Sequence, residues 1–202
     1  VNPYDHEDIF FDGVQLWRSE NGGNFWSEAD PPWWTYDVHA DKHDMYFLGP
    51  DHFLLATDGG LYRTVNSGAN WFKIESNKTN EFYRVAHTHL DAANYYGGMQ
   101  DNGTSGGNAS LTSWPRIFGG DGFQVRFHGS LSNIFYVETQ NGGLNYTDDG
   151  GISFSDLFFP DDGNRTNWDT PYFLSVHDQT ELFAASHTVW RQDFAPYGGW
   201  TE

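Results

Sequence analysis

The residues best suited to chemistry in this sequence are histidines and aspartates that fall in short clusters. His39, Asp41 and His43 alternate with other residues in the segment HADKHD. Two imidazoles and a carboxylate are ligands that zinc or another divalent cation accepts. On an extended strand these side chains share one face, but residues two apart lie about 7 Å from each other. One ion can contact all three only where the chain bends, and hydrogen bonding to neighbouring loops is the alternative role.

Aspartates in glycine-rich stretches form a second group. Asp101 lies in GGMQDNG and Asp121 in GGDG. Such carboxylates can bind calcium or a sugar hydroxyl, or they can bond to their own turns. A glycosidase needs two carboxylates about 5 to 10 Å apart. Asp41, Asp101 and Asp121 are therefore the candidates for catalysis, and the sequence does not pair them.

Two adjacent tryptophans are the candidate stacking surface for a sugar. Trp33 and Trp34 follow Pro31-Pro32, and their rings can form a flat platform or can pack in a core. With Asp121, they are the predicted ligand-binding residues.

The elements that must position these residues repeat along the chain. The pattern S/T-x-D/N-x-G-x-x-W/F occurs at Ser19–Trp26, Thr64–Trp71 and Thr147–Phe154, and Trp114 and Trp200 continue its spacing of 40 to 46 residues. Apolar runs recur in step at 8–11, 53–56, 94–97, 133–136 and 181–184, and further strands are expected at Tyr36–His39, Tyr83–Ala86, Phe123–Arg126 and Phe173–Val176. Each unit therefore predicts four strands, which is the period of a β-propeller blade.

The repeated turn has a structural explanation. An Asp or Asn side chain accepts hydrogen bonds from its own turn, and the following glycine adopts a positive φ. The hydroxyl holds the end of the preceding strand, and the closing aromatic ring packs between sheets. The residues expected to act in this way are Ser19, Asn21, Gly23, Trp26, Thr64, Asn66, Gly68, Trp71, Thr147, Asp149, Gly151 and Phe154.

These segments resemble the Asp-box, or BNR, repeats of sialidases, sortilin-like propellers and xyloglucanase-like two-propeller hydrolases. The phrases Val38–Asp44, Gly97–Gly103 and Gly119–Gly122 are similar to those of bacterial secreted repeat proteins. The resemblance implies an all-β propeller and an extracellular or cell-surface location. It says little about activity, because propellers host many functions.

A sialidase is not expected. Such an enzyme needs clustered arginines to hold the substrate carboxylate. Arg18, Arg63 and Arg191 occupy the same place in successive units and cannot converge. The arginines that remain are Arg84, Arg116, Arg126 and Arg165.

The repeat count predicts about four and a half four-stranded blades, near 1–30, 34–76, 82–117, 123–159 and 172–202. The first unit lacks an inner strand, so its edge is expected to pair with further blades of a longer chain or with another chain. The interpretation is a propeller segment cut from a longer propeller.

Composition limits the partners. The chain has 28 acidic residues against 10 Lys and Arg, a net charge of −18, and no cysteine. A field of this sign repels nucleic acid, and no stretch is apolar for the roughly 18 residues that span a membrane. Three functions stay open: a secreted module that binds a glycan or a protein, a glycoside hydrolase that uses inner-loop carboxylates, and a structural assembly subunit. Calcium or zinc is a possible cofactor.

Overall fold

The structure, a computed structural model, describes residues 1–75, 80–158, 160 and 166–202. The described residues are almost entirely strands and turns, and their two helical elements are three-residue 3-10 turns at Trp33–Thr35 and Gln140–Gly142. No helix in the described part of the chain is long and apolar enough to cross a membrane. The chain divides into two compact units, Val1–Thr79 and Asn80–Glu202, each of which is described by itself.

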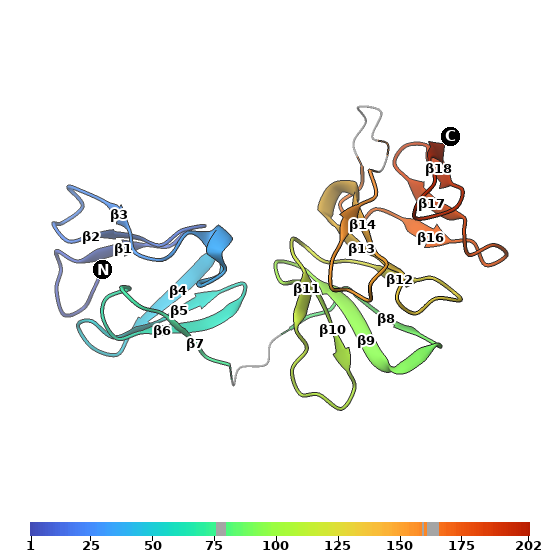
Figure 1. Cartoon of the computed structure of the whole chain (residues 1–202). Coiled ribbons are helices and arrows are strands. Elements are labelled where there is room, and N and C mark those ends of the chain that lie inside the picture. The colour runs from blue at the N-terminus through green and yellow to red at the C-terminus, as the bar shows by residue number, and fades with distance from the viewer. Residues whose placement is uncertain (76–79, 159, 161–165) are drawn as a thin grey trace. The chain divides into compact units, whose positions relative to one another are not determined.

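The first unit holds two antiparallel sheets, each with its strands in chain order (Figure 1). One is three-stranded and the other is four-stranded. The strands are β1 (Ile9–Phe11), β2 (Trp17–Ser19) and β3 (Ser27–Glu28), then β4 (Lys42–Phe47), β5 (Phe53–Thr57), β6 (Gly60–Thr64) and β7 (Phe72–Lys73).

The second unit holds three four-stranded antiparallel sheets, again in chain order. The first contains β8 (Arg84–Thr88), β9 (Asp91–Met99), β10 (Gly103–Asn108) and β11 (Arg116–Phe118). The second contains β12 (Val125–Phe127), β13 (Phe135–Thr139), β14 (Gly143–Thr147) and β15 (Ser155–Asp156). The third contains β16 (Tyr172–Leu174), β17 (Leu182–Ala185), β18 (Val189–Gln192) and β19 (Trp200–Thr201). The predicted all-β propeller segment of about four and a half blades is confirmed.

The cores lie between successive sheets. In the second unit, Tyr136 and Leu144 of the middle sheet pack against Tyr172, Leu182 and Ala184 of the last one, and all five are at most 2% exposed. The sheets approach closely at Gly98, where a Cβ would meet the backbone of the segment that leads into β12. Large rings in the cores and glycine at the contact points allow short strands to bury a continuous apolar layer.

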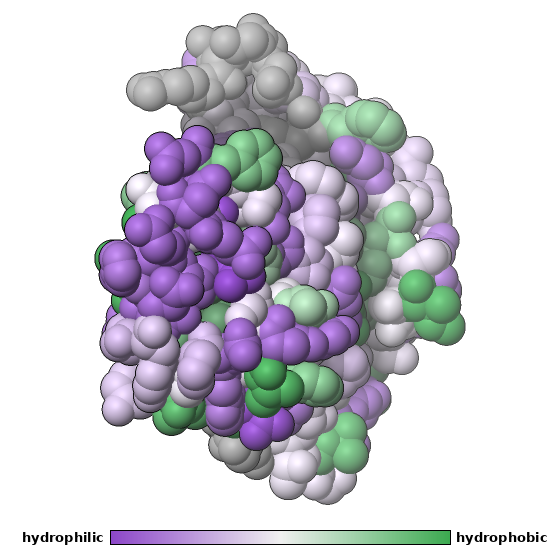
Figure 2. Space-filling view, turned by 90° about the vertical axis from the view of Figure 1, so that its left-hand side faces the viewer, coloured by the Kyte–Doolittle hydropathy of each residue, from purple (hydrophilic) through white to green (hydrophobic). Residues whose placement is uncertain are grey.

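Hydrophobic residues also occur on the surface. Many large apolar side chains are exposed in the described residues. In the view of Figure 2 they form separate patches among hydrophilic residues. Scattered apolar residues of this kind are normal for a folded surface.

The three repeated turns have the same internal bonding. In each, the Asn or Asp oxygen accepts a backbone N–H from four residues further on, as the sequence predicts. The bonds run from Phe25 to Asn21 (2.9 Å), from Asn70 to Asn66 (2.9 Å) and from Ser153 to Asp149 (3.0 Å). The hydroxyls of Ser19, Thr64 and Thr147 accept the N–H of Gly23, Gly68 and Gly151 at 2.8 to 2.9 Å, and these glycines have φ of 90°, 92° and 94°.

The closing aromatic rings differ in burial. Trp71 packs on Phe53 and donates its indole N–H to Ala29 of the preceding sheet at 3.4 Å, and Phe154 packs on Phe118 and Phe135. Trp26 is 37% exposed, although the sequence predicts a buried ring. Its sheet is the first one, so the described residues provide no earlier sheet against which the ring can pack.

The expected strand at Tyr36–His39 is wrong. The prolines before Trp33 are followed by a 3-10 turn, and Tyr36 caps this turn with φ of 60°. Val38 is fully buried and belongs to the core around Phe53, so the segment keeps an apolar residue at its place in the repeat without forming a strand. The first strand of this sheet begins instead at Lys42.

Candidate ligand-binding site

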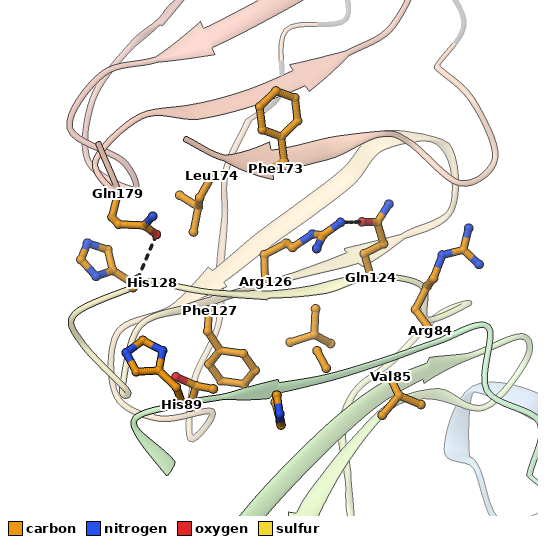
Figure 3. Close-up of a pocket in the computed structure, with 15 residues that line it drawn as sticks. Arg84, Val85, His89, Gln124, Arg126, Phe127, His128, Phe173, Leu174 and Gln179 are labelled. Carbon is orange, nitrogen blue, oxygen red and sulfur yellow. Dashed lines mark hydrogen bonds between the residues drawn. The ribbon is translucent and has the colours of Figure 1, made fainter. Parts of the chain in front are cut away.

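A hollow of about 480 Å³ lies along the inner strands of the second unit, that is, the first strand of each sheet, β8, β12 and β16. Its walls come from residues 84–89, from 124–129, and from Phe173, Leu174 and Gln179. Figure 3 shows the three inner strands side by side around it. A volume of this size is typical of small-ligand sites.

The polar lining of this hollow is basic. Arg84 and Arg126 contribute guanidinium groups, and His87, His89 and His128 contribute imidazoles. No Asp or Glu stands among the described residues that line it. His128 is 8% exposed, and its Nδ1 accepts the N–H of Ser130 at 3.1 Å, which fixes the ring.

Hydrogen bonds connect the inner strands at one end of the hollow. Arg84 Nη2 lies 2.8 Å from Asp169 Oδ2, so β8 is tied to the segment that enters β16. Arg126 Nη2 donates to Gln124 Oε1 at 2.6 Å, and these two side chains point toward each other in Figure 3. Gln124 Nε2 in turn lies 3.5 Å from Asp169 Oδ1. The network holds four polar side chains, on or just before the first strands of three sheets, in one place.

A row of aromatic rings borders this end, formed by Tyr83, Phe123 and Trp168, which precede β8, β12 and β16. Tyr83 stacks on Phe123 with 5.2 Å between ring centroids and 5° between planes, and Trp168 meets Phe123 edge-on at 5.8 Å and 89°. Phe123 is 1% exposed, whereas Tyr83 and Trp168 are 40% and 44% exposed. The buried ring supports two accessible ones. Because Arg84 and Gln124 follow Tyr83 and Phe123 directly, the aromatic row adjoins the hollow.

One carboxyl group near this network has a strongly altered acidity. Glu138 on β13 is 0% exposed and accepts the backbone N–H of Thr170. Burial, with a smaller contribution from the nearby Asp169, raises the pKa of Glu138 to about 8. A buried acid with a raised pKa is often catalytic. Glu138, however, does not line the hollow and has no surface that a substrate can reach, so its role is structural.

The structure uses Asp121 to hold a neighbouring hairpin. Asp121 is 8% exposed, and its Oδ1 accepts the N–H of Asp101 at 2.7 Å. Its own N–H donates to Gln140 Oε1 at 3.0 Å. Asp101 sits in the tight turn between β9 and β10 with φ of 61°. Neither residue is among those that line the hollow.

His39, Asp41 and His43 do not lie along one strand face. β4 starts at Lys42, Asp41 has φ of 57°, and the register shifts between Lys42 and Asp44. The His39 ring fills the space beside Gly59, and its Nδ1 lies 3.1 Å from the carbonyl oxygen of Ala40.

His43 and Asp41 both approach Asp58, which is in the turn between β5 and β6. His43 Nε2 pairs with Asp58 Oδ1, and a carboxylate oxygen of Asp41 lies within 4.8 Å of one from Asp58. Calcium takes six to eight oxygen ligands, so these two carboxylates could supply only part of its shell.

Trp33 and Trp34 do not form a flat platform. Both are exposed, at 45% and 62%, but their planes are inclined at 84° with centroids 5.8 Å apart. A sugar ring can therefore stack on only one of them at a time.

The aromatic row and the basic hollow do not stand out in the sequence. A signal existed: Tyr83-Arg84 and Phe123-Gln124 are aromatic–polar pairs at the same place in two predicted strands. Trp168 could not be aligned with them, because it lies four residues before β16. The arginines set aside after exclusion of a sialidase do converge in part, since Arg84 and Arg126 line one hollow. Arg165 lies outside the described residues, and Arg116 is on the outer strand β11.

Comparison with known proteins identifies the type of fold. No protein-family model matches the sequence, and no curated protein matches it. Among solved structures, the chain is similar over 99% of its length to a GH74 enzyme from Niastella koreensis, with 15% identity, a TM-score of 0.50 and 37% coverage of that chain. An ancestral GH74 enzyme (15% identity, TM-score 0.49, 100% and 30% coverage) and YCF48 from Cyanidioschyzon merolae (15%, 0.41, 96% and 68%) are further matches. The chain spans about a third of the length of the two GH74 enzymes. At this level of identity, the likeness establishes a shared β-propeller-like fold.

Proposed function

We propose that this propeller segment is a glycan-binding module and that the aromatic row is its stacking surface. The observation that carries the proposal is the pair of accessible rings, Tyr83 and Trp168, held on the buried Phe123. Aromatic faces bind the apolar face of a sugar, and neighbouring polar side chains bind its hydroxyls. The polar side chains beside the row that can bind the hydroxyls of the sugar are those of Arg84, Gln124 and Asp169.

Binding is favoured over hydrolysis. A glycosidase needs two carboxyl groups that reach the scissile bond. The described lining of the hollow contains none, Asp121 is engaged with a backbone N–H, and Glu138 is fully buried. A glycoside hydrolase that uses inner-loop carboxylates, with Asp41, Asp101 and Asp121 as the separate candidates, remains the alternative, and its test is release of reducing ends from the same sugars.

The repeated turns support a further proposal about the repeat type and the location of the protein. We take the turns at Ser19–Trp26, Thr64–Trp71 and Thr147–Phe154 to be Asp boxes, because they share one bonding pattern. The Asp-box resemblance supports an extracellular or cell-surface location, which fractionation of the producing cells tests.

The binding experiment compares a variant of the aromatic row with a variant of the tryptophan pair Trp33 and Trp34. Titration calorimetry with neutral β-glucan oligosaccharides measures affinity for the parent, Trp168→Ala and Trp34→Ala. We expect Trp168→Ala to weaken binding about tenfold or more, a loss of about 1.4 kcal/mol, and Trp34→Ala to bind like the parent. Loss of binding in Trp34→Ala alone would move the site to the first unit. Absence of binding to any glycan, with capture of a protein ligand or a second chain, would favour the protein-binding or assembly function.

A further inference from the structure

The hollow beside the aromatic row has the opposite charge to the unit that contains it. Residues 80–202 contain 15 acidic residues, five arginines and no lysine. Two of the five arginines line the hollow, together with three histidines and, among the described residues, no acid. At physiological salt, charges more than about 8 Å away are largely screened. The nearest charges to a group inside the hollow are therefore those of Arg84 and Arg126, together with the carboxylate of Asp169 that pairs with Arg84.

The two arginines are not equivalent. Arg84 is neutralised by Asp169 at 2.8 Å. Arg126 is exposed, and in the part of the chain that the structure describes it forms no ion pair. Among the described residues, Arg126 donates one hydrogen bond, to the neutral side-chain oxygen of Gln124, and this bond orients one side of the guanidinium group. A guanidinium group has five N–H donors, so a forked pair of donors remains for an anion.

We propose that the hollow binds a carboxylate of the ligand on Arg126 and that the glycan recognised by the module is acidic, with uronic acid residues. This inference rests on the proposed glycan-binding function. A planar carboxylate matches the fork of a guanidinium group with two parallel hydrogen bonds. The sugar ring that carries it stacks on the adjoining aromatic row.

The surroundings favour a uronic acid over other anions. A nucleic acid or another dense polyanion is repelled by the net charge of −18. Recognition of an acidic peptide does not require two exposed aromatic rings at the entrance. A glycan with one charge per sugar can stack on the rings and pair its carboxylate with a single arginine. A sulfated sugar offers the same charge with tetrahedral geometry, so the experiment includes one.

The experiment measures the affinity of the whole chain for four probes by calorimetry. They are hexagalacturonate, neutral cellohexaose, a sulfated hexasaccharide and hexaglutamate. The variants are Arg126→Gln, Arg126→Lys and, as a matched control, Arg191→Gln on β18, the third strand of its sheet. Thermal unfolding curves confirm that each variant is folded.

The expected result is at least tenfold tighter binding of hexagalacturonate than of cellohexaose. Arg126→Gln removes this advantage, so that the two oligosaccharides bind about equally, Arg126→Lys restores part of it, and Arg191→Gln behaves like the parent. The inference alone is overturned if cellohexaose binds through Trp168 while hexagalacturonate gains nothing, or if Arg126→Gln binds hexagalacturonate like the parent. Preference for the sulfated probe or for hexaglutamate would also overturn it. Failure of every oligosaccharide to bind would overturn the proposed function itself.

Discussion

At the residue scale, Glu138 shows how the site is held without taking part in it. The carboxyl group lies between the last two sheets of the second unit, where it accepts the N–H of Thr170 just before β16. Its second oxygen has no hydrogen-bond partner among the described residues. An ionised group in this position is poorly solvated, so the proton is retained. Glu138 thus joins two sheets as a neutral acid near neutral pH.

This arrangement predicts an unusual pH dependence of stability. The pKa of Glu138 is about 8 in the folded chain, above its ordinary value of 4.5. Between these values the folded chain holds a proton that the unfolded chain has released. The free energy of unfolding therefore falls as pH rises through this window and levels off above about 8. The contribution of Glu138 to this fall is at most about 5 kcal/mol, since the pKa rises from 4.5 to about 8 and one pKa unit corresponds to about 1.4 kcal/mol.

Glu138→Gln is the variant that isolates this contribution. The amide cannot ionise, so its free energy of unfolding should fall less between pH 5 and pH 9 than that of the parent. Urea unfolding at intervals of pH gives the two slopes. The exposed Glu28→Gln on β3 should keep the slope of the parent. Parallel curves for the parent and Glu138→Gln would show that Glu138 is ionised in the folded chain.

At the element scale, the repeated turns fasten the next-to-last strand of three sheets (β2, β6 and β14) to the segment that follows. The hydroxyl of Thr64 is central to one turn, because it accepts the N–H of Gly68 at 2.9 Å and donates to Asn66 at 3.1 Å. Thr64 is fully buried, so no solvent replaces either bond when the hydroxyl is removed.

Thr64→Val should therefore lower the free energy of unfolding by about 1–3 kcal/mol, the usual consequence of leaving buried polar groups unpaired. The side-chain volume is nearly unchanged, which excludes a packing defect. The same substitution at the exposed Thr201 is the control, since its hydroxyl bonds to Arg191 at a solvated edge. Equal losses in the two variants, measured by urea unfolding, would argue against a special role for the turn.

A buried ion pair joins the two sheets of the first unit. Lys42, the first residue of β4, lies 2.6 Å from Asp30 with both side chains fully buried, and its ammonium group also donates to the carbonyl of Val14 at 2.7 Å. Removing only the cation leaves the carboxylate of Asp30 buried and unpaired, which typically costs several kcal/mol.

Lys42→Met is expected to lower the free energy of unfolding of this unit by about 3–5 kcal/mol, and Lys73→Met on the exposed strand β7 by much less. Adding Asp30→Asn to Lys42→Met should recover part of the loss, because the remaining group is then neutral. Urea unfolding followed by tryptophan fluorescence measures all three. A double variant less stable than Lys42→Met would contradict this account.

The sequence predicted strands well where apolar residues recurred in step with the turns. FLLA and the segment around Phe135 are strands whose side chains are buried or half-buried along their whole length. Prediction failed at Tyr36–His39, where prolines and a left-handed Tyr36 replaced a strand with a turn. The site was harder to predict, because Tyr83, Phe123 and Trp168 are about 40 residues apart and meet only when sheets stack. The ionic pairing of Lys42 likewise depends on a contact between sheets.

At the scale of the whole molecule, charge is distributed unevenly. The net charge is −18, yet the inner strands of the second unit expose arginine and histidine. Mutual repulsion among surface acids destabilises a compact chain, while its short ion pairs, such as Arg18 with Asp8 at 2.6 Å, have the opposite effect. The two effects differ in range, so salt separates them.

Raising sodium chloride from 0.01 M to 0.1 M shortens the screening length from about 30 Å to about 10 Å. Long-range repulsion is then reduced, whereas close and partly buried pairs are little affected. The midpoint of thermal unfolding should therefore rise, by about 2–4 °C if the gain is about 1 kcal/mol. Circular dichroism in the presence of a chelator measures this without divalent cations. Calcium chloride or zinc chloride at matched ionic strength is the second arm, because a further rise would reveal a specific cation site of the kind considered for His39, Asp41 and His43. A midpoint that falls with sodium chloride would mean that attractive ion pairs outweigh the repulsion of the excess acids.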